Sequence, residues 1–215
     1  MYKYHKIETL FNRDDKFKVT DEIRLPEFKN IKKWLITEKI DGMNIRVIYK
    51  PGEPSELLFR GRTDNAQMPT YLLEVLERMF TEDKFEKIFP PERLLSCVCL
   101  YGEGYGQKIQ KGGGNYNKGN SFRLFDVLID GWWLEWDDVE EVAKQFGIKT
   151  APKCGIMTLE KAVKIVPSNH SWVAISDNDT DILAEGIVAR AYPMVLFRNK
   201  IPIKWKLKIK DFIEK

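Results

Sequence analysis

The chain has 215 residues, which is enough for one domain, or a modest two-lobed one, with a sizeable core. A hydrophobic fraction of 43% and an aromatic fraction of 12% exclude a disordered protein, and no apolar run approaches the length of a membrane span. The net charge of +3 does not demand a nucleic-acid partner, but permits one if the lysines gather on one face.

The cysteines point to a reducing compartment. Cys97, Cys99 and Cys154 are odd in number and lack the spacing of zinc or redox sites. The N-terminus has no apolar segment of the signal-peptide type. We therefore expect an intracellular, cytoplasmic protein. His5 and His170 lie far apart in sequence and suggest neither a histidine metal site nor a Ser-His triad.

Residues 1–33 are polar and mixed, and Pro26 is expected to stop any helix from running into the strand predicted at 34–40. Lys39 lies at the end of that strand, directly before the turn-forming pair Asp41-Gly42, and a second strand follows at 45–49. A hairpin with a solvated lysine is one interpretation. The other is a nucleophile, because burial or nearby positive charge makes a lysine amine neutral and reactive.

The next segments alternate between strands and helices. A strand at 57–60 runs into Arg60-Gly61-Arg62, which is either a phosphate-binding fork or an ordinary hairpin end. A helix at 69–80 has an apolar stripe that belongs to the core, and a short charged helix follows at 82–88. A strand at 94–101 then leads to Glu103, framed by two glycines, and to a glycine-rich loop at 107–116.

The strand predicted at 121–129 places Phe122, Leu124 and Asp126 on one face and Arg123, Phe125 and Val127 on the other. Three tryptophans follow at 132, 133 and 136, and we expect at least one of them in the core. Asp137-Asp138 is expected to cap a helix at 139–146, and a second amphipathic helix is predicted at 159–166.

Two further segments carry charge. Glu185 precedes a glycine and a β-branched strand. Residues 201–210 alternate lysine with apolar residues, so that the lysines share one face of a strand. They either protect an edge strand from aggregation or form a cationic rail for a triphosphate. Several strands with helices between them and no regular βαβ period predict an α+β domain built on antiparallel sheets.

Five short motifs occur in a specific order: K-x-D-G at Lys39, Gly-Glu at Glu103, F-x-x-F-D-V from Phe122, E-G-I-V from Glu185, and K-x-K near the C-terminus. This order resembles the covalent nucleotidyltransferase superfamily of polynucleotide ligases and mRNA capping enzymes, over residues 38–208. The resemblance implies an ATP-grasp-like fold, in which two antiparallel sheets with flanking helices form a nucleotide-binding cleft. It also implies that residues 1–215 are a single nucleotidyltransferase domain without an OB-fold or other accessory domain.

The resemblance assigns the phosphate chemistry to lysines. Lys39 matches the nucleophile that attacks the α-phosphate of a nucleoside triphosphate and forms a lysyl-nucleotide. Lys204 and Lys206 match the two later lysines that contact this phosphate, with Lys208 as a register alternative. Glu185 matches the carboxylate associated with Mg²⁺ or Mn²⁺, and its hard oxygen atoms suit either ion.

Other positions are implied to bind the nucleoside or the acceptor. Phe122 matches the ring that stacks on the purine, and Glu103 matches the ribose-binding glutamate. Arg62, with Arg60 as the alternative, matches the basic residue that touches the sugar or the acceptor's 5′-phosphate. The remaining positions implied to bind the nucleotide lie in the lysine motif: Glu38, Asp41, Gly42 and Asn44.

The branch of the superfamily is indicated by Asn44, because DNA ligases usually have arginine there and the type 2 nick-sealing RNA ligases have asparagine. Those ligases often have histidine in the place of Asp41. We expect an ATP-dependent RNA ligase that joins 3′-hydroxyl and 5′-phosphate ends, with a nicked duplex as substrate. A minimal DNA ligase and a non-catalytic nucleic-acid-binding module are the alternatives, whereas a GTP-dependent capping enzyme would need an OB domain.

Overall fold

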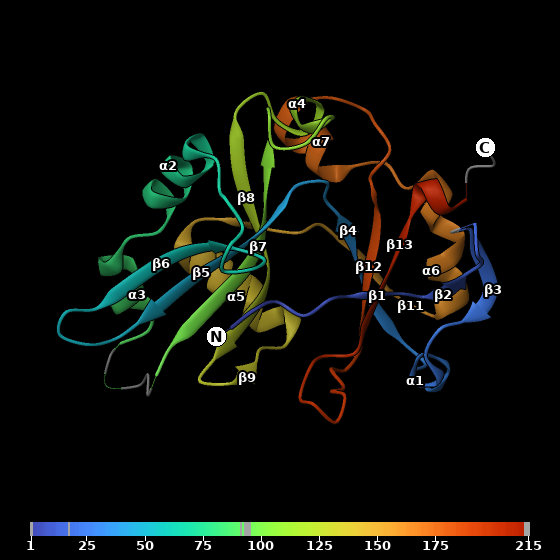
Figure 1. The fold of residues 1–215 in the computed structure, drawn as a ribbon, viewed down its shortest axis with the longest axis horizontal. Coiled ribbons are helices and arrows are strands. Elements are labelled where there is room, and N and C mark those ends of the chain that lie inside the picture. Colours follow the sequence, from blue (N-terminus) through green and yellow to red (C-terminus); the bar gives the residue numbers. More distant parts are fainter. Residues whose placement is uncertain (1, 17, 91, 93–95, 213–215) are drawn as a thin grey trace. The chain divides into compact units, whose positions relative to one another are not determined.

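A computed structural model describes residues 2–16, 18–90, 92 and 96–212 (Figure 1). It has the expected α+β class, with mainly antiparallel sheets and flanking helices. The chain divides into two compact units. Unit 1 contains Met1–Tyr4 and Asp41–Ala151, and unit 2 contains His5–Ile40 and Pro152–Lys215. The first two residues of the strand predicted at 94–101 lie outside the described part of the chain.

Unit 1 is built on one sheet in the order β10-β8-β7-β5-β6, with β9 paired to β8. The pairs are antiparallel, except that β10 runs parallel to β8. The strands are β5 (Met43–Lys50), β6 (Glu56–Gly61), β7 (Val98–Gly106), β8 (Asn120–Ile129), β9 (Trp132–Trp133) and β10 (Lys149–Thr150). The helices are α2 (Thr70–Met79), α3 (Glu82–Ile88), α4 (Gly113–Tyr116) and α5 (Trp136–Phe146).

The core of unit 1 lies on one face of this sheet. Alternate residues of β5, such as Ile45 and Val47, are fully buried there with Leu72 of α2 and Phe146 of α5. The intervening residues of β5 therefore project from the opposite face, because successive strand residues point to opposite sides. That second face carries polar side chains, and it positions the candidate site residues of unit 1.

A β-bulge changes the alternation in β8. Tyr101 of β7 pairs with Asp126, but the next residue, Gly102, pairs with Leu124, so Phe125 is an extra residue. The extra residue turns the strand over, as bulges do. Leu124 and Val127 consequently both lie in the core. The prediction that Asp126 shares a face with Leu124 is therefore wrong.

Unit 2 has a second sheet in the order β1-β13-β12-β4-β11, in which only β1 and β13 run parallel. Its strands are β1 (Glu8–Thr9), β4 (Trp34–Lys39), β11 (Lys153–Met157), β12 (Gly186–Ala191) and β13 (Lys204–Lys208), and β2 (Phe11–Arg13) pairs separately with β3 (Val19–Ile23). The helical segments are α1 (Pro26–Asn30), α6 (Leu159–Ile165), η2 (Val166–Ser168), α7 (Trp172–Asn178) and η3 (Ile209–Asp211).

One face of this sheet is the core of unit 2, where Trp34, Ile187 and Trp205 are fully buried with Ala162 of α6. Trp34 and Trp205 meet edge to face, with ring centroids 5.5 Å apart. Lys39, Lys206 and Lys208 belong to the opposite set of alternating positions. The core therefore fixes which way the lysines point.

Several local predictions need correction. A short helix that the sequence did not predict, α1, begins at Pro26, because proline is well suited to the first helical turn; it ends at Asn30, so no helix runs into β4. The helix predicted from 139 begins at Trp136, and Asp137-Asp138 lies in its first turn rather than at its cap. Trp136 is 2% exposed, which confirms the expectation of a core tryptophan, whereas Trp132 is 77% exposed. Among the described residues, no helix is long and apolar enough to span a membrane.

Candidate active site

Lys39 is the last residue of β4, and the boundary between the two units falls one residue later, after Ile40. The lysine therefore belongs to unit 2, and Asp41-Gly42 belongs to unit 1. Lys39 lies at the end of an inner strand of the unit 2 sheet, because β4 lies between β12 and β11. An inner strand, paired on both sides, gives this side chain a fixed origin.

Three charged side chains meet at the end of this sheet. The carboxylate of Glu185 accepts hydrogen bonds from the ammonium groups of Lys39 and Lys208, one on each oxygen atom. The side chains are partly buried, with 20% of Lys39, 17% of Glu185 and 27% of Lys208 exposed. We call these three residues the lysine cluster. It places two positive charges on either side of one negative charge.

The protonation of Glu185 reflects two opposing effects. Burial raises the pKa of this carboxyl, but the charges and hydrogen bonds of Lys39 and Lys208 together lower it more. The net result is a pKa below the ordinary glutamate value. Glu185 is therefore ionised at neutral pH and available as an oxygen ligand or hydrogen-bond acceptor.

The strand register explains why Lys208 joins the cluster. Gly186 of β12 pairs with Lys39 on one side and with Lys208 on the other. Two residues earlier in β13, Lys206 pairs with Val188, which pairs with Thr37 on its other side. Residues paired directly across neighbouring strands point to the same face of the sheet, so Lys206 and Lys208 lie on the same face as Lys39.

Lys204 lies further along β13, away from the row that contains Lys39, Gly186 and Lys208. It pairs with Arg190, level with Leu35, four residues along β13 from Lys208, and it is only 3% exposed. At about 3.3 Å per residue this separation is roughly 13 Å. The register therefore favours Lys206 and Lys208, the register alternative, over Lys204 and Lys206 as the lysines that accompany Lys39. The sequence pattern alone, with a lysine at every second position, left this register open.

Glu38 was expected to bind the cofactor, but the structure gives its side chain another contact. The carboxylate accepts hydrogen bonds from the Ser171 hydroxyl at 2.5 Å and from the Val173 amide at 3.2 Å, and the residue is 2% exposed. Ser171 is the N-cap of α7. The Glu38 side chain therefore joins the strand of Lys39 to the start of this helix, a link that the sequence did not reveal.

In unit 1, three polar residues form a row across the face opposite the core. Asn44 pairs with Glu103, and Glu103 pairs with Arg123 on the far side. The Arg123 guanidinium donates to the Tyr105 hydroxyl, 3.1 Å away. Within the described part of the chain, the side-chain oxygen of Asn44 is buried without a hydrogen-bond partner. A buried acceptor of this kind is costly unless a ligand or water donates to it.

Gly42 packs directly against the Glu103 segment. A Cβ atom at position 42 would lie 2.3 Å from the carbonyl oxygen of Gly104 and 2.8 Å from the Glu103 side chain. The Gly42 carbonyl also accepts a hydrogen bond of 2.9 Å from Gln110. Only glycine permits this approach. It brings the turn of the lysine motif, with Asp41 beside it, against the Glu103 strand.

The structure contradicts the stacking role expected of Phe122. Its ring is 1% exposed and meets Phe80 edge to face in the core of unit 1, with ring centroids 5.3 Å apart. No face of this ring is open to a base. Phe125, the extra residue of the bulge, is only partly buried, and the centroid of its ring lies 5.2 Å from that of Tyr4. Regular alternation could not have shown this, because a bulge moves the second aromatic residue.

Arg62 is exposed on the loop that follows β6. This loop is fastened by Arg46, which is fully buried and donates to the Gly61 carbonyl and to the Asp64 carboxylate, each at 2.7 Å. The hydrogen bond and charge of Arg46 lower the pKa of Asp64. The base of the loop that carries Arg62 is thus tied to β5 by an arginine whose role the sequence did not reveal.

The side chains of the site offer few ligands for a divalent metal ion. Among the described residues, no three His, Cys, Asp or Glu side chains are placed to hold an ion together. A single carboxylate, such as Glu185, fits Mg²⁺ when the substrate's phosphates and water complete the coordination, which is how this ion is commonly bound. The residues are therefore compatible with a divalent ion that arrives with a nucleotide.

Comparison with known proteins identifies the family. The RNA ligase family model matches residues 32–206, which is most of the chain. The chain belongs to the RNA ligase family. A comparison with curated protein sequences finds no match. The matched region of the family includes β4 with Lys39, Glu185, and β13 as far as Lys206.

Solved structures of a Naegleria gruberi RNA ligase have a similar fold. A variant with ATP and manganese has a TM-score of 0.63 and 17% identity, over 96% of this chain and 59% of that one. A variant with AMP and manganese gives 0.63 and 17%, over 96% and 62%. An apo variant gives 0.64 and 17%, over 98% and 60%. This chain thus spans about three fifths of the length of the ligases it matches.

Proposed function

We propose that this chain is the nucleotidyltransferase domain of an ATP-dependent RNA ligase. The observation that carries the proposal is the lysine cluster, in which Lys39 and Lys208 share the carboxylate of Glu185. A nucleophilic lysine beside other cations and a hard-oxygen ligand is suited to attack on a nucleotide phosphate. Membership of the RNA ligase family supports this reading.

In the proposed first step, Lys39 loses a proton from its ammonium group and the resulting amine attacks the α-phosphorus of ATP. A P–N bond forms, the nitrogen loses a second proton to solvent, the bond to the bridging oxygen breaks, and pyrophosphate leaves. Lys206 and Lys208 lie on the same face of the sheet and would stabilise the charge on the transferring phosphoryl group. The role first assigned to Lys204 passes to Lys208. A divalent ion held by Glu185 would supply further charge compensation.

In the next two steps, AMP is transferred from Lys39 to the 5′-phosphate of an RNA end. A 3′-hydroxyl then attacks this activated phosphate, which forms the phosphodiester and releases AMP. We propose Arg62 for the acceptor phosphate, because it is exposed on a fastened loop and guanidinium binds phosphate bidentately. The nicked duplex stays our preferred substrate.

The polar row of unit 1 is proposed to bind the nucleoside. Glu103 and Asn44 would bind the ribose, whose hydroxyl groups could donate to the buried oxygen of Asn44. Asp41 and Gly42 would hold the lysine motif in place. Phe125 replaces Phe122 as the candidate for stacking on the base, because it is partly buried whereas Phe122 is enclosed in the core.

Labelling with α-³²P-ATP and Mg²⁺ or Mn²⁺, followed by denaturing electrophoresis, tests the first step. We expect covalent label in the wild type and none in Lys39→Arg, which keeps the charge at this position. Lys33→Arg, a change at an exposed lysine, is the matched control and should retain label. Absence of label from the wild type with ATP and with GTP, under both metals, would reject the enzymatic proposal.

The substrate is tested separately, with pre-adenylylated protein and nicked duplexes of RNA, DNA and hybrid composition. Sealing of RNA nicks in preference to DNA nicks is expected from the family. Preference for DNA nicks would support the minimal DNA ligase instead. RNA binding without any lysyl-AMP would support the non-catalytic module.

A further inference from the structure

The connection between β12 and β13 is an ordered loop with an unusual surface. Residues 192–202 form it, and Figure 1 shows that it extends from the ends of the two strands. Backbone hydrogen bonds fix its shape: the Phe197 amide donates to Ile201 at 2.8 Å, the Lys200 amide to Phe197 at 2.9 Å, and the Ile203 amide to Val195 at 2.8 Å. An ordered loop loses little conformational entropy on binding.

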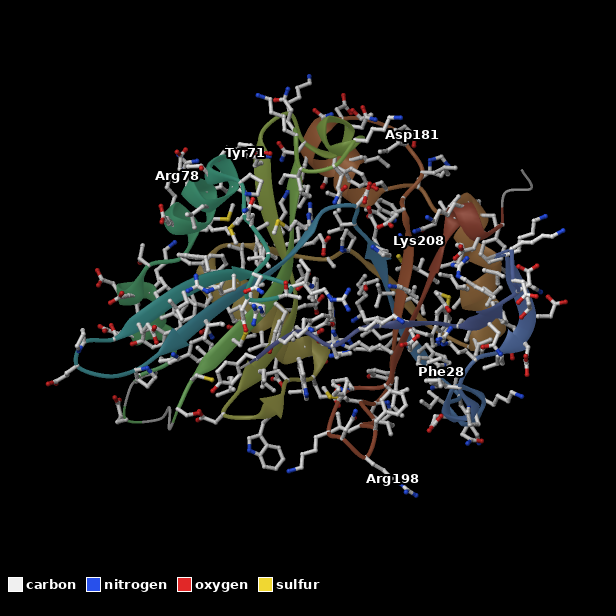
Figure 2. The ribbon with its side chains drawn as sticks, in the orientation of Figure 1. Phe28, Tyr71, Arg78, Asp181, Arg198 and Lys208 are labelled. Carbon is white, nitrogen blue, oxygen red and sulfur yellow. The ribbon has the colours of Figure 1, made fainter. Side chains whose placement is uncertain are left out.

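The exposed side chains of this loop combine aromatic, aliphatic and basic groups. Tyr192 is 40% exposed, and Val195 and Leu196 are each 43% exposed. Arg198 and Lys200 are exposed at the turn, and Figure 2 shows the Arg198 side chain pointing away from the loop. Neighbouring exposed apolar side chains rimmed by charged ones are a feature of interaction sites.

Charge selects the partner. The loop of residues 192–202 contains two basic residues, Arg198 and Lys200, and no acidic one, and the whole chain has a net charge of +3. The base of the loop is also basic, because the Tyr192 amide donates to the carbonyl of Lys33, next to Lys32, and both lysines are exposed. A polyanion therefore fits this surface better than a second copy of the chain.

We infer that the loop of residues 192–202 is a docking surface for an RNA strand. Arg198 and Lys200 contact phosphates, and Tyr192 stacks on an unpaired base or packs on a sugar. This combination of cations and an aromatic ring is typical of sequence-tolerant single-strand binding. The loop joins β12 to β13 at the end of these strands opposite to Glu185 and Lys208, so it gives the proposed ligase a second grip on its substrate within unit 2.

This inference rests on the proposed function for its biological meaning, but the two can fail separately. Fluorescence anisotropy with a labelled 20-nucleotide RNA measures binding by the full chain over a range of salt concentrations. The test variant is Arg198→Gln/Lys200→Gln. The matched control is Lys161→Gln/Lys164→Gln, which removes two exposed charges from α6 in the same unit. Thermal unfolding checks that each variant is folded.

We expect the loop variant to bind about 10- to 30-fold more weakly near 0.1 M salt, with a slope of log K against log salt that is shallower by about 1.4. The control should change neither value by more than about twofold. Tyr192→Leu should weaken binding about fivefold through lost stacking, without changing the slope. The lysyl-AMP yield should be unchanged in all of them.

Equal losses in the loop variant and the control, or unchanged RNA affinity in the loop variant, would overturn the inference. A sedimentation experiment could also overturn it: if the loop variant lost a dimer but kept its RNA affinity, the loop would be an interface between two copies of the protein. A wild type that binds RNA through the loop but forms no lysyl-AMP would reject the proposed reaction and leave this inference standing.

Discussion

Replacing Lys208 with methionine tests the strand register most directly. The change keeps an unbranched side chain and removes one of the two ammonium groups bound to Glu185. At a separation of about 4 Å, a cation contributes about 4 kcal/mol to an adjacent negative charge in a partly buried setting. Removal of one such preorganised contact typically costs a rate factor of about 10² to 10³. We expect lysyl-AMP formation to slow by this factor.

Lys204→Met provides the contrast. Lys204 is four residues along β13, and at roughly 13 Å the same Coulomb energy is only about 1.3 kcal/mol. We therefore expect a loss of about tenfold or less. Lys210→Met, at an exposed position in η3, controls for the loss of a lysine from this segment.

The assay is the initial rate of labelled lysyl-AMP formation at saturating ATP, with thermal unfolding to exclude misfolded variants. The register argument would be refuted by a Lys208→Met protein that is as fast as wild type while Lys204→Met is about a hundredfold slower. That result would mean that β13 presents a different pair of lysines to the phosphate.

Three further predictions concern stability and nucleotide binding. The pKa of Glu185 is lowered in the folded chain, so the ionised carboxylate stabilises the fold above the ordinary carboxyl pKa, and this stabilisation is lost as pH falls through the folded-state pKa. The difference in Tm between wild type and Glu185→Gln should therefore shrink below about pH 4. A difference in Tm that stays constant with pH would contradict this. Phe122→Ala should lower the free energy of unfolding, measured with urea, by about 3–5 kcal/mol, because this ring is in the core. Phe125→Ala should mainly raise the KM for ATP. If Phe125→Ala lost the stability and Phe122→Ala raised the KM, Phe125 would not be the stacking residue. Gly42→Ala should impair lysyl-AMP formation at least tenfold, because its Cβ would meet the Gly104 carbonyl; normal activity would show that this approach is not required.

The sequence predicted the α+β class and most long elements because their apolar periodicity is strong. The helix at 69–80 and the strands around Lys39 are examples, each close to the observed α2, β4 and β5. The short strands β1, β2 and β3 were missed, because two to five mostly polar residues are too few to show a period. Helix α7 was missed because its seven residues are too few to show a helical period.

The candidate site was predicted best where local sequence controls the geometry. Lys39 and Glu185 are brought together by pairing between β4 and β12, in agreement with the order of the motifs. The choice among lysines 204, 206 and 208 depends on register between distant strands, which a repeating pattern cannot specify. The choice between Phe122 and Phe125 depends on a bulge, whose position follows from pairing with β7.

The lysine cluster also has a consequence for how an anion is captured. Its two ammonium groups already hold a carboxylate, so a phosphate enters by exchange and not by simple addition. The free energy gained is the difference between two similar charge-assisted hydrogen bonds, which is small. A lone inorganic phosphate therefore has little advantage over Glu185. Glu185 thus competes with small anions for Lys39 and Lys208. A larger ligand must gain its affinity from contacts made by the rest of its structure.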